Sequence, residues 1–177
     1  MKGYSKLAAR VRVPSGFLVA GLYLLYARPR RESLVAGLLV ALAGIGLRAW
    51  AAGHLAKNEA LATGGPFAYT RNPLYLGTLA AGAGFALAGW NAWVAALLAA
   101  YFGAVYGPVI GEEESHLRKL FTEYAEYAAR VPRLAPRFSA AGGGGGKFRW
   151  SLYFRNQEYQ ALLGYLAGAA ALIWKVG

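Results

Sequence analysis

The sequence predicts an all-α membrane protein, a bundle of about five transmembrane helices with a cytosolic amphipathic helix after the fourth. Of the 177 residues, 57% are hydrophobic and only 15% are charged, whereas soluble domains average roughly 25% charged residues. The apolar residues form long uninterrupted blocks instead of a one-faced or alternating pattern. We therefore expect residues 1–177 to form a single integral membrane domain.

The charge balance is strongly basic, with a formal net charge of +11, eight acidic residues and no Asp. Nucleic-acid binding would suit such a balance, but the basic residues lie at the ends of apolar blocks, where anionic lipid headgroups attract them. We expect a bilayer and no nucleic acid as partner. Cys is absent, which excludes disulfides and thiolate ligands. His54 and His116 lack the H-E-x-x-H spacing, so no metal is expected.

The first apolar block, 13–27, has arginines on both sides. A signal peptide would lack the dense basic run on its far side, so this block predicts a first membrane helix. The second block, about 33–53, ends near Arg48 and Trp50, which suit a membrane boundary.

The third apolar region runs from 73 to 111 without a charge. As one helix it would be nearly twice as long as the ~30 Å hydrocarbon layer is thick. It must therefore fold back, and G-W-N-A-W at 89–93 is the natural break. The last block, about 159–176, is the fifth span.

Small residues recur within the spans, as in A-G-L-L-V-A-L-A-G-I-G, and predict close helix packing. Five glycines stand at 142–146. The phosphate-loop pattern G-x-x-x-x-G-K-[ST] fails there, with Ala141 in place of the first Gly and Phe148 after the Lys. Residues 142–147 are predicted to be a flexible linker before the last helix.

The positive-inside rule orients the five spans. With a cytoplasmic N-terminus, all basic residues face the cytoplasm except Arg28, Arg30, Arg31 and Lys175. This orientation places 54–72 and 111–156 on the same cytoplasmic side, so two polar segments distant in sequence can meet.

The first of these polar segments is T-G-G-P-F-A-Y-T-R-N-P-L-Y-L-G, residues 63–77. Gly64, Gly65 and Pro66 forbid a continuous helix, while Pro73 suits the first turn of the next one. Arg71 and Asn72 then lie at a helix N-terminus, whose free N–H groups favour an anionic group. A re-entrant turn with interfacial Tyr and Arg anchors is the simpler interpretation.

The second polar segment is residues 111–136. The spacing of Leu117, Leu120, Phe121, Tyr124 and Tyr127 predicts an amphipathic helix on the membrane surface. Three adjacent glutamates, 112–114, precede it in a chain with eight acids. The helix dipole explains one Glu at such a position, but acids at a membrane boundary indicate a site.

These residues resemble a known family. R-N-P-L-Y-L-G is similar to the motif R-[HN]-P-x-Y-x-G. E-E-S-H-L-R-K-L-F-T-E-Y-A-E-Y-A-A-R-V-P-R is similar to E-E-x-x-L-x-x-x-F-G-x-x-Y-x-x-Y-x-x-x-V-P-R. Both belong to the isoprenylcysteine carboxyl methyltransferase and phospholipid methyltransferase group of integral membrane enzymes, and the resemblance covers about 33–137.

The resemblance implies S-adenosylmethionine as methyl donor, bound on the cytosolic side between the two segments, and a lipid-like acceptor that enters from the bilayer. It implies a catalytic set of Glu113, Glu114 and Arg71. The cofactor-binding residues that it implies are Gly65, Pro66, Tyr69, Arg71, Asn72, Pro73, Tyr75, Gly77 and Glu113.

The acceptor is less well defined. Enzymes of the group that methylate a prenylcysteine carboxylate tend to carry an arginine where this chain has Val109, so an amine headgroup is favoured. An amine acceptor would need a base, for which Glu114, His54 and His116 are candidates. Thr122 replaces the motif Gly after Phe. Weaker candidates for headgroup contacts are His54, Arg155, Asn156 and Glu158.

Two alternatives remain open. An NADPH-dependent membrane reductase of the steroid or sterol type resembles this chain in its C-terminal region, but such enzymes are usually longer and more basic. A non-enzymatic membrane protein such as a small transporter is the other, although transporters more often place charges in the middle of their spans.

Overall fold

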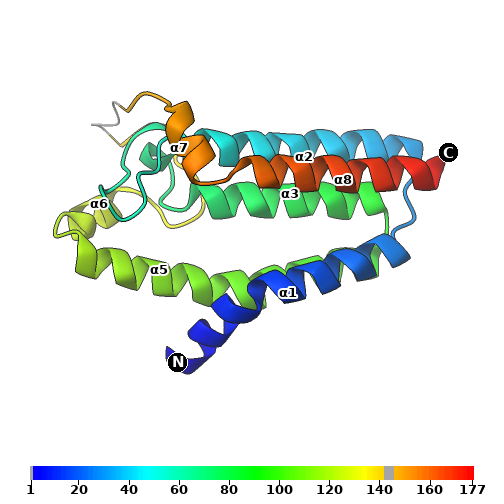
Figure 1. Cartoon of the computed structure of the whole chain (residues 1–177), viewed down its shortest axis with the longest axis horizontal. Helices are drawn as coiled ribbons and strands as arrows, with labels where there is room; N and C mark the ends of the chain where they lie inside the picture. Colours follow the sequence, from blue (N-terminus) through cyan, green and yellow to red (C-terminus); the bar gives the residue numbers. More distant parts are fainter. Residues whose placement is uncertain (1, 142–145) are drawn as a thin grey trace.

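The computed structural model describes residues 2–141 and 146–177, and within these ranges the chain contains helices and no strands (Figure 1). The long helices are α1 (Lys2–Tyr26), α2 (Arg31–Ala52), α3 (Pro73–Gly89), α4 (Ala92–Tyr101), α5 (Gly107–Leu120) and α8 (Tyr159–Val176). The shorter elements are the 3₁₀ turn η1 (Gly65–Ala68), the π-helix η2 (Phe102–Tyr106), α6 (Tyr124–Arg130) and α7 (Trp150–Arg155).

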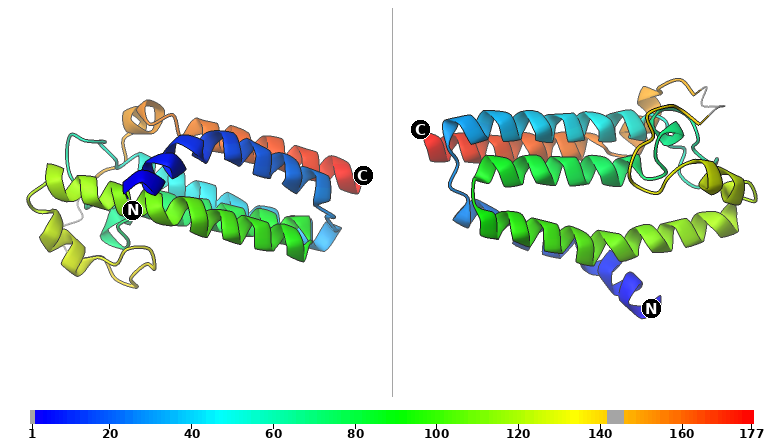
Figure 2. Two further views of the ribbon diagram at one scale, coloured as in Figure 1. Left: turned by 90° about the horizontal axis from the view of Figure 1, so that it is seen from below. Right: turned by 180° about the vertical axis from the view of Figure 1, so that it is seen from behind.

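The long helices form two layers, with α2, α3 and α8 side by side in one and α1 with α4 and α5 in the other (Figures 1 and 2). One end of the bundle carries η1, α6 and α7, and we call it the loop end. The opposite end carries the α1–α2 connection, the α3–α4 connection and Gly177, and we call it the turn end. The predicted block 13–27 forms the second half of the longer helix α1.

Glycines allow α2 and α3 to lie in backbone contact. A Cβ atom at Gly44 would lie 2.5 Å from the Ala81 nitrogen, and one at Gly84 would lie 2.3 Å from the Ala41 nitrogen. Gly37 and Gly77 are equally closed by backbone atoms of the opposite helix. The predicted packing through small residues is therefore confirmed for this helix pair.

The predicted break at 89–93 is also confirmed. Helix α3 ends at Gly89, and Trp90 follows in the left-handed conformation with φ 45°. Asn91 then caps α4, because its side-chain oxygen accepts from the Trp93 and Val94 N–H groups. This N-cap satisfies donors that the first helical turn leaves unpaired.

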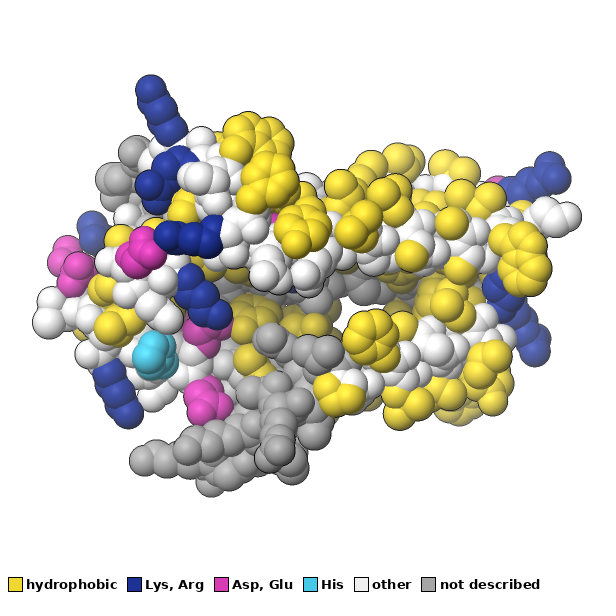
Figure 3. Space-filling view, in the orientation of Figure 1, with side chains coloured by type: hydrophobic (Ala, Val, Ile, Leu, Met, Phe, Trp, Pro, Cys, Tyr) yellow, Lys and Arg dark blue, Asp and Glu magenta, His cyan; other side chains and the backbone are white. Residues whose placement is uncertain are grey.

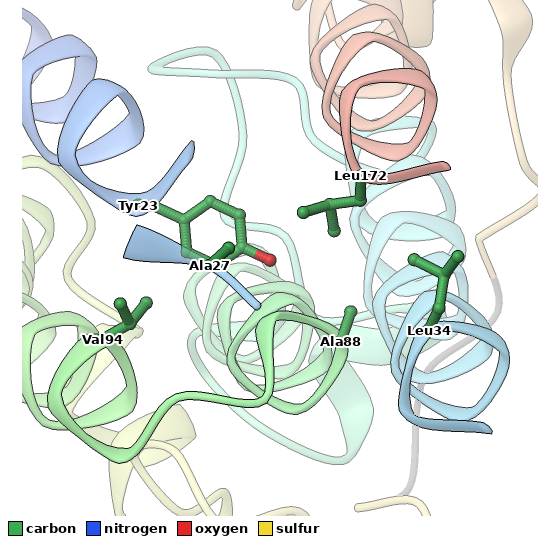
Figure 4. Close-up of a cluster of buried hydrophobic side chains, with 6 residues drawn as sticks. All are labelled: Tyr23, Ala27, Leu34, Ala88, Val94 and Leu172. Carbon is green, nitrogen blue, oxygen red and sulfur yellow. The ribbon is translucent and has the colours of Figure 1, made fainter. Parts of the chain in front are cut away.

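A hydrophobic core closes the turn end of the bundle (Figure 4). Its buried members come from five helices and the α1–α2 connection: Tyr23, Ala27, Leu34, Ala88, Val94 and Leu172. The buried Tyr23 hydroxyl donates to the Phe85 carbonyl at 2.7 Å, which satisfies its hydrogen bonding within the core. Lys175 donates to the Leu24 and Ala27 carbonyls and so fixes the end of α8 to the end of α1.

Apolar side chains cover the outside of the long helices, and Lys and Arg gather at both ends (Figure 3). Phe17, Leu39 and Leu163 are each more than half exposed. Two helical stretches, Arg31–Ala52 and Ala92–Leu120, are long and apolar enough to cross a bilayer, and Pro14–Tyr26 and Pro73–Gly89 are shorter apolar helices. The exposed apolar surface is of the kind that lipid covers.

The amphipathic helix predicted from the spacing of Leu117 to Tyr127 is wrong as a single surface helix. Helix α5 ends at Leu120, Phe121 is extended, and the chain resumes as the short helix α6. Tyr124 and Tyr127 point into a buried cluster with Val131. Burial of these rings against the protein outweighs a continuous helix on the membrane. The predicted linker falls mostly on 142–145, outside the described residues.

Candidate active site

The two polar segments meet at the loop end. The Tyr75 hydroxyl on the first turn of α3 donates to Oε2 of Glu113 on α5 at 2.7 Å. The Nε atom of Arg71 lies 3.2 Å from Oε1 of Glu114. The start of α3 and the acidic turn of α5 therefore form one side-chain cluster, although about forty residues separate them in the sequence.

Backbone pairing with the segment after α6 holds the α3 entrance in place. The Arg71 N–H donates to the Pro132 carbonyl at 2.9 Å, and the Tyr69 carbonyl accepts from the Arg137 N–H at 3.0 Å. The Thr70 side chain is 2% exposed, and its hydroxyl donates to the Leu134 carbonyl at 3.1 Å. These contacts satisfy the backbone N–H and C=O groups of the segment before α3. Gly65 and Pro66 prevent this segment from being helical, so it cannot pair these groups within a helix.

Glu114 is the centre of a charged network. Its carboxylate lies 3.2 Å from Nε of Arg133, at the same distance from Nε of Arg71, and accepts from Nδ2 of Asn72 at 3.3 Å. Arg71 also donates to the Ala128 carbonyl at 2.7 Å. Because two guanidinium groups engage Glu114, its charge is neutralised and it connects α3, α5 and the loop.

Two buried polar atoms beside this network lack a hydrogen-bond partner among the described residues: Nε of Arg71 and the hydroxyl of Tyr124. The Arg71 nitrogen is close enough to Glu114 for an ion pair but lacks hydrogen-bond geometry. Burial raises the pKa of Tyr124, and the negative charge of Glu114 adds to the rise. Burial also raises the pKa of Tyr127, whose hydroxyl donates to the Phe67 carbonyl.

Glu113 has different surroundings. It accepts from Tyr75 but forms no ion pair with any residue of 2–141 or 146–177 whose side chain is described. The Tyr75 ring contacts Tyr106 with 5.8 Å between centroids, and Tyr106 contacts Tyr101 at 6.1 Å. Both of these tyrosines border or belong to the π-helix η2. Such π-helical turns often occur at functional sites.

Four of the expected cofactor residues have packing roles. Pro66 and Pro73 are buried, at the start of η1 and α3. Gly65 has φ 55°, and a Cβ atom there would meet the His54 ring at 2.6 Å. Gly77 faces α2, where a Cβ atom would lie 2.6 Å from the Gly44 carbonyl oxygen. Tyr69, which was also expected to bind the cofactor, contacts the Trp50 ring.

The weaker headgroup candidates all have protein partners. His54 has both ring nitrogens near carbonyls, of Trp50 at 2.9 Å and Gly146 at 3.0 Å. Asn156 donates to the carbonyls of Ala52, the last residue of α2, and Leu55. Arg155 pairs with Glu59 on the surface. A cleft of about 350 Å³ lies beside His54, lined by His54, Leu61, Ala62, Thr63, Gly64, Gly146, Lys147 and Arg149.

Glu158 forms a buried ion pair that the sequence did not predict. Its two oxygens accept from Nε and Nη2 of Arg48 at 2.6 and 3.0 Å, and Glu158 is 7% exposed. Arg48 also donates to Thr78. This pair fixes the start of α8 to α2 and α3, and it gives Arg48 a structural role.

Sequence reasoning also missed Arg133, Tyr101 and Tyr106. Arg133 ends the V-P-R part of the second motif, so the motif itself was the available signal. Tyr101 and Tyr106 stand five residues apart in an apolar block, a spacing that brings side chains together on a π-helix. Among the described residues, no group of three or more His, Cys, Asp or Glu side chains is arranged to hold a metal ion.

Two apolar helical stretches long enough to cross a bilayer, together with the Tyr–Glu–Arg cluster at the loop end, indicate a helical membrane protein with a polar site at one end of its bundle. Residues 33–124 match the model of the phospholipid methyltransferase family. This match covers more than half of the chain, and the chain therefore belongs to that family, as the two motifs predicted.

Two curated relatives carry names from metal resistance. The chain is 39% identical over 113 residues to the cobalt-zinc-cadmium resistance protein CzcN of Cupriavidus metallidurans, covering 62% of this chain and 52% of the relative. It is 35% identical over 109 residues to the nickel-cobalt-cadmium resistance protein NccN of Alcaligenes xylosoxydans xylosoxydans, covering 60% and 51%. The chain thus spans about half the length of the curated relatives that it matches. No solved structure matches it.

Proposed function

We propose that this chain is an S-adenosylmethionine-dependent methyltransferase whose acceptor is a lipid-like or membrane-partitioned molecule, with an amine favoured over a carboxylate. The contact between Tyr75 and Glu113, at the ends of two apolar helices in a chain of the phospholipid methyltransferase family, carries this proposal. At this contact, a polar site for the methyl donor would lie next to the apolar helix surface from which a lipid-like acceptor would enter.

The residues present fit a cofactor that carries a sulfonium, an ammonium and a carboxylate. Glu113 supplies a carboxylate that no described cation neutralises, which suits the positive groups. The start of α3 suits the carboxylate of the cofactor, because its first N–H groups are not capped by the Asn72 side chain. Asn72 donates to Glu114 and to the Arg133 carbonyl instead. We place the cofactor between these two features, with Arg71 as the residue that holds them together through Glu114.

When bound, S-adenosylmethionine supplies an electrophilic methyl group for an in-line displacement. The chain then has to orient an acceptor nucleophile and exclude water, and orientation alone can contribute several kcal/mol. The rings of Tyr75, Tyr106 and Tyr101 form a row of aromatic contacts that begins at the Tyr75–Glu113 hydrogen bond. An acceptor that arrives as an ammonium group must lose a proton before its nitrogen can attack the methyl group. Of the three candidate bases, Glu114 is engaged by two arginines and both His54 nitrogens face carbonyls, which leaves the exposed His116 on α5.

The substrate preference follows from the charges near the site. A carboxylate acceptor would approach Glu113, a like charge, without an arginine at position 109, where the structure has a buried valine. An amine carries the charge that Glu113 attracts. The names of the relatives give no acceptor, and metal resistance is a property of those proteins.

We further propose five membrane spans, formed by α1, α2, α3, the continuous α4–η2–α5 helix and α8, with the loop end in the cytoplasm. About 20 residues cross the hydrocarbon layer. Counted from Ala92, the layer therefore ends near Gly111, and Glu112–Glu114 stand at its boundary. The excess of basic residues at the loop end supports this orientation.

Site-directed labelling tests the topology, because the chain has no native Cys. A membrane-impermeant maleimide should label Gly177→Cys in intact cells and Ser139→Cys only after permeabilisation. Both positions are exposed, at opposite ends of the bundle. Labelling of both in intact cells, or the reverse pattern, would overturn the proposed orientation.

The activity test is incubation of the purified protein with methyl-labelled S-adenosylmethionine and a total lipid extract. We expect a labelled amine-containing lipid product, and Tyr75→Phe should lower the rate at least severalfold while the protein stays folded. Surface variant Lys57→Gln is the control and should keep full activity. No labelled product with any extract would contradict the proposed function.

A further inference from the structure

A second candidate site lies at the turn end, away from the proposed chemistry. We infer that it binds the phosphate headgroup of one anionic phospholipid in the leaflet opposite the methyl-transfer site. The site is a pocket of about 640 Å³, which we call the turn-end pocket. Its lining residues are Leu22, Tyr26, Arg28, Trp90, Asn91, Ala92, Trp93, Val94 and Leu97.

The positive charges at the turn end are not neutralised by acidic side chains among the described residues. Arg28 lines the pocket, Arg30 and Arg31 follow it, and all three are exposed and form no ion pair with any described residue. The nearest acid in the sequence is Glu32, which also has no ion-pair partner among the described residues. Lys175 is engaged by carbonyls of α1. Arginine binds phosphate through two parallel N–H donors, so these guanidinium groups, which have no acidic partner among the described residues, suit a phosphodiester.

Trp90 provides a second, independent observation. Its left-handed backbone conformation, with φ 45° and ψ 43°, is unfavourable for a bulky aromatic residue. Glycine would adopt it without strain. The conformation is held by Asn91, whose side chain donates to the Tyr26 carbonyl and accepts from α4. The Arg30 guanidinium lies over the Trp90 ring, 5.4 Å from its centroid. Strain of this kind is retained where a side chain has a function.

The pocket walls indicate a lipid and not a free anion. Leu22 and Leu97 line the pocket on α1 and α4, and the exposed Trp93 stands at its mouth. Tryptophan is enriched where membrane headgroups meet the hydrocarbon. A ligand that fills this site needs a phosphate for the arginines and a hydrocarbon chain for the leucines. The inference depends on the proposed membrane placement, but not on the cofactor or the reaction.

The test is native mass spectrometry of the detergent-purified protein with equal amounts of phosphatidylglycerol and phosphatidylethanolamine. We expect one phosphatidylglycerol to be retained in preference to phosphatidylethanolamine. The double variant Arg28→Gln/Arg30→Gln should lower its retention on the order of tenfold or more, since each basic residue near a membrane surface contributes roughly a fivefold effect. Trp90→Gly should also lower retention while leaving the fold intact, because it removes the ring and relieves the strain.

The matched control is Lys57→Gln/Lys119→Gln, which removes two exposed charges at the loop end and should leave retention unchanged. Equal retention of both lipids, or an equal loss in the control, would overturn the inference. Displacement of the lipid by glycerol phosphate at similar concentration would overturn it in favour of a free phosphate site. Stabilisation by S-adenosylhomocysteine, measured on the same variants, should be unaffected, so failure here is distinguishable from failure of the proposed methyltransferase.

Discussion

Glu113 and Glu114 are neighbours in the sequence with opposite surroundings. Successive residues on an α-helix point about 100° apart, so Glu113 faces Tyr75 while Glu114 faces Arg71 and Arg133. The motifs predicted that both acids meet the α3 entrance. They could not predict the division of roles, because it depends on the loop after α6, which brings Arg133 to Glu114 and leaves Glu113 without a cation among the residues whose side chains are described.

This division predicts different effects on stability. Glu114→Gln should lower the melting temperature in detergent by several degrees, because Arg71 and Arg133 lose a charged partner and hydrogen bonds to charged groups contribute about 1.5–3 kcal/mol each. Glu113→Gln should change the melting temperature by much less, since an amide can still accept from the Tyr75 hydroxyl. The measurement is thermal unfolding of both variants in one detergent.

A reversed order, with Glu113→Gln the more damaging variant, would show that the ion-pair network around Glu114 is not what holds the loop end together. Asn72→Ala offers an independent comparison, because it removes one donor to Glu114 and leaves both arginines in place. It should fall between the two glutamate variants.

At the scale of elements, α2 and α3 are held together by glycines at backbone contact. The small-residue pattern predicted this packing, and the G-W-N-A-W turn predicted where α3 ends. The break at Phe121 and the π-helix at 102–106 were not predictable by the same reasoning. Both depend on which residues the aromatic side chains pack against. The spacing of these side chains in the sequence is the same whether the helix continues or breaks, so the spacing alone could not predict the break.

The contact between α2 and α3 gives a paired prediction. Gly44→Ala should destabilise the protein by about 1–3 kcal/mol, because the added Cβ would lie 2.5 Å from backbone of α3 and must push the helices apart. Gly46→Ala adds the same methyl group to open space, with no atom within 4 Å, and should be neutral or slightly stabilising. Thermal unfolding of both variants compares them, and equal effects would contradict the close packing of α2 on α3.

At the scale of the whole molecule, the two ends of the bundle differ in charge. The loop end combines acids and bases in networks, whereas Arg28, Arg30 and Arg31 at the turn end lack acidic partners among the described residues. The sequence predicted a helical protein with apolar blocks ending in basic residues. It did not predict that the last helix attaches through the Arg48–Glu158 pair. An Arg and a Glu near the ends of two apolar blocks look the same in a sequence whether they pair with each other or lie separately at the membrane interface.

A calorimetric titration of the purified protein with S-adenosylhomocysteine measures the proposed cofactor site without an acceptor. We expect one molecule to bind per chain. Replacement of Glu113 by Gln should weaken binding by roughly tenfold or more, because a charged partner of the cofactor's ammonium is lost, and Lys119→Gln should bind like the original chain. A titration without heat and without thermal stabilisation, or unchanged binding by Glu113→Gln, would contradict a cofactor site between Tyr75 and Glu113.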